Sequence, residues 1–271
     1  MPRKCPARAG HVTRVTCRTD DDVRLHGVVL QPGKSPAEVA IVVGHGFTNH
    51  VSKSFVNRVL RRLALRHTVI AFDFRGHGRS GGRCTAGPDE VHDLTAAVRL
   101  ARAVGPGPVG TPRFDGLGFS MGGTVALLQA ASATGEDRPD AVVSVSSPSR
   151  WWVRQTRAMR TLYWLAERPQ GRALLRTVRV RLARPLQRGL PASPVEVVER
   201  IGPTPLLLVH GAEDHYLPAE HAMVLHAAAG ATAELWLRPG MRHAETAMTP
   251  ELVDQLGEWL AAKANGAERA A

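Results

Sequence analysis

One short stretch of the sequence, residues 118 to 123, combines residue types that could activate a nucleophile. It reads Gly-Phe-Ser-Met-Gly-Gly, a G-x-S-x-G pattern around Ser120, between a strand-like run (112–119) and a small-residue helical run (124–132). Because glycine lacks a Cβ, strand and helix can approach closely there and leave the hydroxyl on a sharp, exposed turn. The following helix directs its free N–H groups at the place where an oxyanion would form. The stretch predicts a nucleophilic serine; the alternative is a glycine-rich turn with an incidental serine.

A serine hydroxyl needs a base to accept its proton, and an acid must hold that base in one tautomer. Two later loops supply candidates, each after a strand-like apolar run. Asp214 follows the run at 206–209, and His243 follows the run at 233–237. The order Ser120, Asp214, His243 is the one expected when the nucleophile lies on a strand-to-helix turn.

Both assignments have rivals in the sequence. Asp214 could instead cap the following helix, and Glu213 is adjacent to it. Three other histidines lie on or beside the predicted helix at 218–229, where a solvated role explains them: His215, His221 and His226. We favour Asp214 as the acid and His243 as the base, because His243 alone follows the end of a strand in the required way.

An oxyanion hole requires two N–H donors. We expect one to be the amide of Met121, directly after the nucleophile, and the other to be the amide of Phe47, in the loop after the strand-like run at 39–43. His45 lies in the same loop, and we expect it to brace the loop rather than to take part in the reaction.

These residues must be positioned by buried strands and by helices that follow them. Residues 11–19 and 22–31 alternate β-branched and polar residues around an acidic turn, which predicts an edge hairpin. Short apolar runs predict strands that are buried on both faces; they cover 39–43, 68–73, 112–119, 141–145, 204–210 and 233–237. Helices are predicted at 54–66, 89–104, 124–132, 218–229 and 250–262.

Strands that alternate with helices of this length form a mostly parallel sheet covered by helices on both faces. Right-handed crossovers bring the loops at the carboxyl ends of the strands to one edge, where open α/β sheets bind their ligands. The three candidate side chains are therefore expected to meet at that edge.

The chain has 271 residues, of which 44% are hydrophobic, and this suits one large domain with an insertion or at most two domains. No apolar run is long enough to cross a bilayer, and residues 1–10 lack the apolar segment of a secretory signal. The three cysteines have neither metal-ligand nor redox spacing. We therefore expect a cytoplasmic protein with reduced thiols.

The net charge of +11 is concentrated in one segment. Residues 148 to 190 contain eleven arginines and one acidic residue, Glu167, so this segment carries +10 and the rest of the chain is nearly neutral. Nucleic-acid-binding proteins usually spread basic residues over one face of a recognisable module. We therefore expect no nucleic-acid partner.

Four motifs in this order resemble the α/β-hydrolase family, and most closely its serine-aminopeptidase-like and its lysophospholipase or monoacylglycerol-lipase-like members. They are the loop with His45-Gly46-Phe47, the loop from Asp73 to Ser80, the turn at Ser120, and the pair Asp214 and His243. The likeness extends over residues 23 to 260 apart from the basic segment. In the family, the loop beginning at Arg75 is mainly structural. A serine rather than an aspartate as the nucleophile argues against membership of the family's epoxide-hydrolase and dehalogenase branches.

The resemblance implies an α/β-hydrolase fold with a helical lid inserted after the sixth strand. We assign residues 11–147 and 202–264 to the core and 148–201 to a basic helical lid, and we expect flexible tails at 1–10 and 265–271.

Within the predicted lid, arginines recur at helical spacing from Arg150 to Arg168, with apolar residues on another face, which predicts an amphipathic helix that ends at Pro169. A similar pattern predicts a second helix over 172–184. The arginines are either a solvated face or a surface for anionic lipid headgroups or a phosphate-bearing substrate. Under the second interpretation, Trp151 and Trp152 line an acyl pocket.

The sequence thus predicts a serine hydrolase that cleaves a carboxylic ester of medium apolar character through an acyl-enzyme. No metal or organic cofactor is expected, and the sequence does not indicate the oligomeric state. A peptidase or thioesterase would use the same residues, and a hydrolase fold that only binds a ligand or partner is the alternative of a different class.

Overall fold

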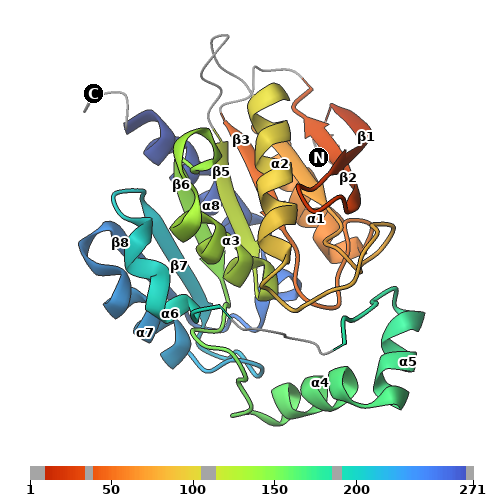
Figure 1. The fold of residues 1–271 in the computed structure, drawn as a ribbon. Coiled ribbons are helices and arrows are strands. Elements are labelled where there is room, and N and C mark those ends of the chain that lie inside the picture. Colours follow the sequence, from red (N-terminus) through yellow and green to blue (C-terminus); the bar gives the residue numbers. More distant parts are fainter. Residues whose placement is uncertain (1–9, 34–38, 105–113, 185–190, 267–271) are drawn as a thin grey trace, which may run out of the picture.

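The computed structural model describes residues 10–33, 39–104, 114–184 and 191–266 (Figure 1). The tails predicted at 1–10 and 265–271 lie outside the described residues, except for Gly10 and the last turn of the C-terminal helix.

The described residues form an eight-stranded sheet in the order β1-β2-β4-β3-β5-β6-β7-β8. Only the pairs β1/β2 and β2/β4 are antiparallel, and every other pair is parallel. The strands are β1 His11–Arg18, β2 Arg24–Gln31, β3 Ala40–Gly44, β4 Thr68–Phe72, β5 Phe114–Phe119, β6 Ala141–Val145, β7 Leu206–Gly211 and β8 Ala233–Arg238. The predicted edge hairpin and mostly parallel sheet are confirmed.

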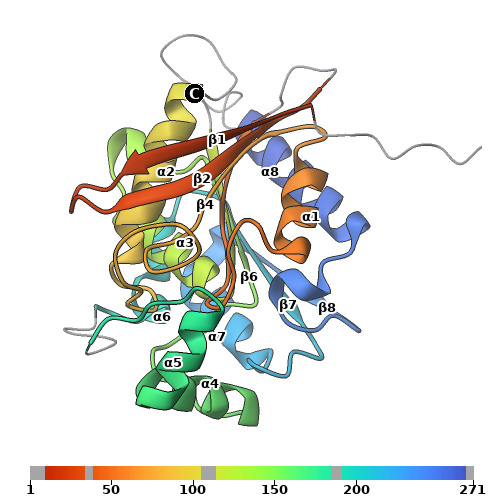
Figure 2. The same ribbon diagram turned by 90° about the vertical axis from the view of Figure 1, so that its right-hand side faces the viewer.

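Helices cover both faces of this sheet (Figure 2). The helices are α1 Ser54–Leu63, α2 Glu90–Val104, α3 Met121–Ser132, α4 Arg157–Glu167, α5 Pro169–Thr177, α6 Pro194–Val197, α7 Glu220–Ala229 and α8 Pro250–Gly266. Short 3₁₀ turns lie at Gly135–Asp137, Val198–Ile201, Gly230–Thr232 and Ala244–Ala247.

Strand β3 illustrates why the sheet is buried on both faces. Its side chains alternate: Ala40 and Val42 pack into the core under α2, α3 and α7, while Ile41 and Val43 pack into the core under α1 and α8. All five residues of β3 are buried. A continuous apolar run is therefore what a central parallel strand requires.

Helix α1 is shorter than the sequence pattern predicts. It ends at Leu63 rather than at residue 66, and Ala64 closes its last turn through a hydrogen bond to the Leu60 carbonyl. The apolar pattern continues past the helix because Ala64 is itself buried in the core. Burial and helical conformation therefore end at different residues here.

The segment between β6 and β7 differs most from its prediction. Arg150 and Arg154 precede α4, which begins at Arg157 with Thr156 as its N-cap. The first predicted helix ends close to Pro169, as expected: α4 stops at Glu167, and Pro169 then starts α5, where its missing N–H costs nothing. The second predicted helix exists but is wrong after Thr177. It is α5, which begins at Pro169 rather than at residue 172 and ends at Thr177, and Val180 and Leu182 then form isolated β-bridges with His77 and Cys84. The residues 185–190 lie outside the described part of the chain.

Candidate active site

Ser120 occupies a strained turn between β5 and α3. Its backbone has φ 51° and ψ −115°, a conformation that costs a non-glycine residue about 1–3 kcal/mol. Neighbouring elements hold it in place: its N–H donates to the Val145 carbonyl at 2.8 Å, and the Thr124 N–H donates to the Ser120 carbonyl at 3.0 Å. The Ser120 hydroxyl therefore lies at the carboxyl ends of the parallel strands, where the sequence predicts it.

Glycines make this turn sterically feasible. A Cβ on Gly118 would lie within 3.0 Å of the Gly122 backbone, and one on Gly122 would lie equally close to the Gly44 carbonyl oxygen. Since contacts this short with backbone atoms cannot be relieved by a side-chain rotation, both positions require glycine.

His243 and Asp214 complete a hydrogen-bonded chain with the serine. The Ser120 hydroxyl lies 3.0 Å from His243 Nε2, and His243 Nδ1 lies 2.7 Å from Asp214 Oδ2. With Asp214 ionised, Nδ1 keeps its proton and donates a hydrogen bond to the carboxylate, which leaves Nε2 free to accept the serine proton. This is the geometry of a base held in one tautomer.

Asp214 is held as an acceptor by its own loop. Its side chain is fully buried, and Oδ1 accepts the backbone N–H groups of Tyr216 at 2.8 Å and Leu217 at 3.0 Å. Burial pushes the pKa of the Asp214 carboxyl upward, but the hydrogen bonds from His243 and from these amides outweigh it and leave the pKa below its ordinary value. The carboxylate is therefore charged while it accepts the hydrogen bond from His243 Nδ1–H.

The loops that carry Asp214 and His243 are tied to each other. The Glu213 N–H donates to the Met241 carbonyl at 3.1 Å, and the Ala212 N–H donates to the Arg238 carbonyl at 3.0 Å. The Ala244 N–H donates to Ser146 Oγ at 3.2 Å, which anchors the base loop to the end of β6.

The rival candidates are not hydrogen-bonded to Ser120, although His215 borders the same cavity. Glu213 is exposed. His221 accepts from the Ser149 N–H at 3.1 Å, and His226 is 3.1 Å from the Ala233 carbonyl. His215 is exposed and stacks on Tyr216, with ring centroids 4.5 Å apart. Among these residues and His243, only His243 hydrogen-bonds to Ser120.

Two backbone N–H groups are available near the serine. Met121 is the first residue of α3, so its N–H has no acceptor within the helix. Phe47 follows β3 in a turn closed by a 3.0 Å hydrogen bond from the Asn49 N–H to the Gly46 carbonyl. Among the described residues the Phe47 N–H has no acceptor. Phe47 and Met121 both border the cavity that contains Ser120.

His45 braces the loop of Phe47. Its Nε2 accepts the Phe74 N–H at 3.0 Å, so its Nδ1 carries a proton and donates to the Gly46 carbonyl at 2.8 Å. Burial holds the pKa of His45 well below its usual value, which keeps this tautomer neutral. His77 contacts the Phe47 carbonyl from the other side.

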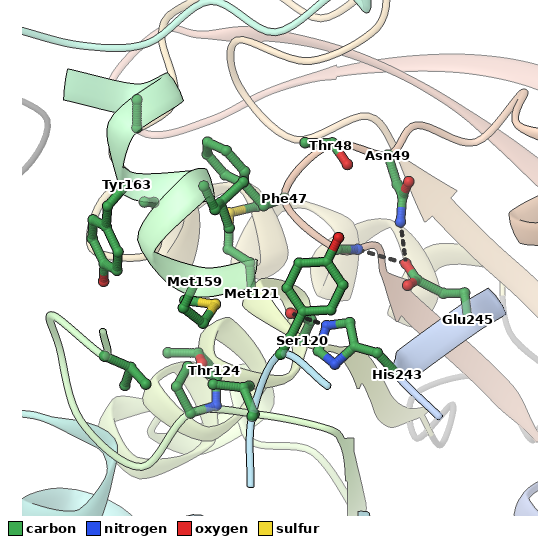
Figure 3. Close-up of a pocket in the computed structure, with 18 of the residues that line it drawn as sticks. Phe47, Thr48, Asn49, Ser120, Met121, Thr124, Met159, Tyr163, His243 and Glu245 are labelled. Carbon is green, nitrogen blue, oxygen red and sulfur yellow. Dashed lines mark hydrogen bonds between the residues drawn. The ribbon is translucent and has the colours of Figure 1, made fainter. Parts of the chain in front are cut away.

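A cavity of about 530 Å³ opens over Ser120 and His243 (Figure 3). On one side it is closed by apolar and aromatic residues from α4, including Met159, Tyr163 and Ala166. On the other side, beside His243, it is bordered by Asn49, Lys53, Glu245 and Thr246. The cavity thus has an apolar part and a polar part that meet at the serine.

The two tryptophans expected in an acyl pocket are separated by the structure. Trp151 lines the cavity, and its Nε1 donates to the Pro191 carbonyl at 2.9 Å. The expectation for Trp152 is wrong: it is 41% exposed, stands outside the lining and stacks on Tyr163 with ring centroids 5.4 Å apart. Its backbone has a φ of +60°, in the left-handed region that few non-glycine residues adopt.

Sequence reasoning missed two residues that border the site. Tyr216 lies two residues after Asp214, and its ring centroid is 4.7 Å from that of His243. Glu245 lies two residues after His243, is only 2% exposed and hydrogen-bonds to the loop of Phe47. The one hint in the sequence is that an acidic residue lies two positions after His243. Its hydrogen-bond partner, Gly46, is 199 residues away and could not be identified from the sequence.

Across the described ranges, no three His, Cys, Asp or Glu side chains gather in a way that could hold a metal ion. In the same part of the chain, no helix is both long and apolar enough to span a membrane. Cys17 and Cys84 carry free thiols, while Cys5 lies outside the described residues.

Comparisons with known proteins agree with this geometry. The model of the Alpha/beta hydrolase family matches residues 41–255. The esterase Pf2001 of Pyrococcus furiosus is similar, with 26% identity over 93% of this chain and 92% of that one and a TM-score of 0.71.

Two further structures share the fold. The α/β hydrolase GrgF from Penicillium sp. sh18 has 17% identity over 94% and 99% of the two chains and a TM-score of 0.71. An esterase domain of a Rhodothermus marinus protein has 22% identity over 93% and 97% and a TM-score of 0.62. This chain belongs to the α/β-hydrolase family.

Proposed function

We propose that this protein is a serine hydrolase that cleaves carboxylic esters through an acyl-enzyme. The observation that carries the proposal is the hydrogen-bonded chain from Ser120 through His243 to Asp214, at 3.0 and 2.7 Å. A hydroxyl, an oriented imidazole and a buried carboxylate in this order are what acyl transfer requires.

In the first half of the reaction, Ser120 Oγ attacks the ester carbonyl carbon while His243 Nε2 accepts its proton. The carbonyl oxygen becomes an oxyanion, which accepts hydrogen bonds from the amides of Phe47 and Met121. Asp214 stabilises the imidazolium. When the tetrahedral intermediate collapses, the bond to the alcohol oxygen breaks, and His243 delivers the proton to the leaving alcohol.

In the second half, water takes the place of the alcohol. His243 accepts a proton from the water as it attacks the acyl carbon, and the second intermediate collapses to release the carboxylic acid and restore the Ser120 hydroxyl. No step of this cycle needs a metal or an organic cofactor.

The substrate we propose is a small ester with a medium apolar acyl group, such as an acylglycerol or a lysophospholipid. Residues of α4 and Trp151 supply an apolar wall for the acyl chain. The resemblance of the chain to an esterase supports an ester over an amide or thioester. A peptidase or thioesterase activity would use the same three residues.

We further propose that the segment 148–201 acts as a lid. Helix α4 supports this because its inner residues line the cavity while its outer face is exposed. At 100° per residue, Arg157, Arg160, Trp164 and Arg168 share that outer face. A row of exposed arginines with a half-exposed tryptophan suits an anionic lipid surface. If the protein floats equally with neutral and with anionic vesicles, the proposed binding of the arginines to anionic lipid is refuted.

The experiment that tests the activity is labelling with a fluorophosphonate, which reacts only with an activated serine. Wild-type protein should label, and Ser120→Ala should not. Ser52→Ala, which removes an exposed serine outside the site, is the control and should label normally. Rates on p-nitrophenyl esters of graded acyl length, compared with aminoacyl and thioester substrates, then define the substrate class. A wild-type protein that neither labels nor hydrolyses any of them would favour a ligand-binding role instead.

A further inference from the structure

Glu245 joins two loops that the proposed reaction needs in register. Its carboxyl is buried, and its Oε1 accepts two hydrogen bonds, from the Gly46 N–H at 2.6 Å and from Asn49 Nδ2 at 3.1 Å (Figure 3). Glu245 follows His243 by two residues, and Gly46 immediately precedes Phe47. One side chain therefore connects the loop of the base with the loop of the oxyanion donor.

The hydrogen bonds around Gly46 determine where the Phe47 N–H points. The Gly46 carbonyl, which shares a peptide group with that N–H, accepts from His45 Nδ1 at 2.8 Å and from the Asn49 N–H at 3.0 Å. Because a peptide group is planar, fixing the carbonyl on one side directs the Phe47 N–H to the other. Glu245 holds the preceding peptide group, between His45 and Gly46, through the Gly46 N–H.

The close approach of the carboxyl depends on the glycine. A Cβ on Gly46 would lie 3.2 Å from both Glu245 Oε2 and Asn49 Nδ2 and 3.3 Å from Glu245 Oε1, which is tighter than most real Cβ contacts. The Gly46 N–H is buried against this acceptor, so removing the carboxyl would leave the amide without a partner and favour a rearranged loop.

We propose that Glu245 is a positioning residue for the oxyanion hole: it holds the Phe47 amide at a set distance from His243. This inference rests on the proposed hydrolase function and adds to it a fourth side chain that acts through the backbone of another loop.

The role we assign to Glu245 is that of an acceptor and not that of a charge. A negative charge behind the donor loop would oppose the oxyanion, and burial already raises the pKa of the Glu245 carboxyl. Both hydrogen bonds converge on one oxygen, Oε1. Since glutamine offers an amide oxygen in the same position, Glu245→Gln should preserve both bonds.

The test compares Glu245→Ala, Glu245→Gln and the control Glu251→Ala, which removes an exposed glutamate from the first turn of α8. Steady-state rates on p-nitrophenyl butyrate are measured together with the inhibition constant of a trifluoromethyl ketone, whose serine adduct carries an oxyanion. Melting temperatures report on folding.

We expect Glu245→Ala to lower kcat by about 10- to 100-fold and to change KM by less than about threefold. The inhibition constant of the ketone should rise by about the same factor as kcat falls. In Glu245→Gln, kcat, KM and the inhibition constant should each stay within about threefold of the wild-type values. Glu251→Ala should have the same constants as the wild-type protein. If Glu245→Ala does not fold, Glu245→Met keeps the volume without a strong acceptor and carries the same expectation.

Three results would overturn the inference: unchanged kcat in Glu245→Ala, a fall in kcat without weaker ketone binding, or a glutamine variant as impaired as the alanine one. The last result would mean that the charge matters. If the wild-type protein neither reacts with fluorophosphonate nor hydrolyses esters, the proposed function itself fails. An active wild type with an equally active Glu245→Ala would refute only the role of Glu245.

Discussion

His243 Nε2 lies 3.0 Å from Ser120 Oγ, although 123 residues separate the two along the chain. They meet because β5 and β8 end at the same edge of the parallel sheet and because the Ser146 hydroxyl anchors the loop just after His243. At this distance the proposed base lies within direct hydrogen-bond reach of the serine proton.

The role of Asp214 can be separated from that of its neighbour. Asp214→Asn should lower kcat by about 10⁴-fold, because an amide no longer holds the imidazole in the tautomer that accepts the serine proton. Glu213→Gln, the matched change at the adjacent exposed residue, should leave kcat unchanged. Both are checked with steady-state kinetics on one p-nitrophenyl ester. A larger loss in Glu213→Gln than in Asp214→Asn would reverse the assignment of the acid.

The tight turn at the serine makes a prediction about stability. Gly118→Ala should lower the free energy of unfolding by about 3 kcal/mol, because its Cβ would overlap the Gly122 backbone. Gly116→Ala, two residues earlier in β5, is the control, since a Cβ there meets nothing within 4 Å. Its unfolding free energy should stay within about 0.5 kcal/mol of wild type. Urea denaturation measures both, and equal effects would contradict the packing argument.

The two adjacent tryptophans should differ in their effect on substrate selection. Trp151→Ala should raise KM by about tenfold for esters with a long acyl chain and leave the acetyl ester unaffected, because Trp151 lines the apolar part of the cavity. Trp152→Ala should change KM by less than about threefold for both the long-chain ester and the acetyl ester, since Trp152 does not line the cavity. A larger effect of Trp152→Ala would show that its contact with Tyr163 shapes the cavity.

The neutral, buried His45 predicts a loss of stability in acid. Burial lowers the pKa of His45 in the folded protein below its ordinary value of 6.5, so at intermediate pH the unfolded chain binds a proton that the folded chain does not. Stability from this group is therefore complete above pH 6.5 and falls as the pH drops below it, by about 1.4 kcal/mol per pH unit.

Two measurements check this expectation: urea unfolding at several values of pH, and the NMR resonances of the His45 ring in the folded protein. The ring should remain neutral while stability declines. Titration of His45 in the folded state near its ordinary pKa would contradict the tautomer assigned from its contacts with Phe74 and Gly46.

The segment between β6 and β7 was the hardest part to predict. Its arginine and leucine spacing favours a helix through residue 184, but the chain leaves α5 after Thr177 because Val180 and Leu182 pair with a distant loop at His77 and Cys84. Long-range pairing of this kind has no local signal. Trp152 is a similar case, since its contact with Tyr163 outside the cavity lining has no signal in the local sequence.

The sequence by itself determined the mostly parallel sheet, its order of strands and helices, and the candidates Ser120, Asp214 and His243, because burial and sharp turns leave local patterns of apolar residues and glycine. Only the tertiary structure decided which residues meet. The contact of Glu245 with Gly46, the shape of the cavity under α4 and the exposure of Trp152 depend on packing between segments far apart in the chain. Such contacts arise from the sum of many weak interactions across the fold, and no short stretch of sequence records them.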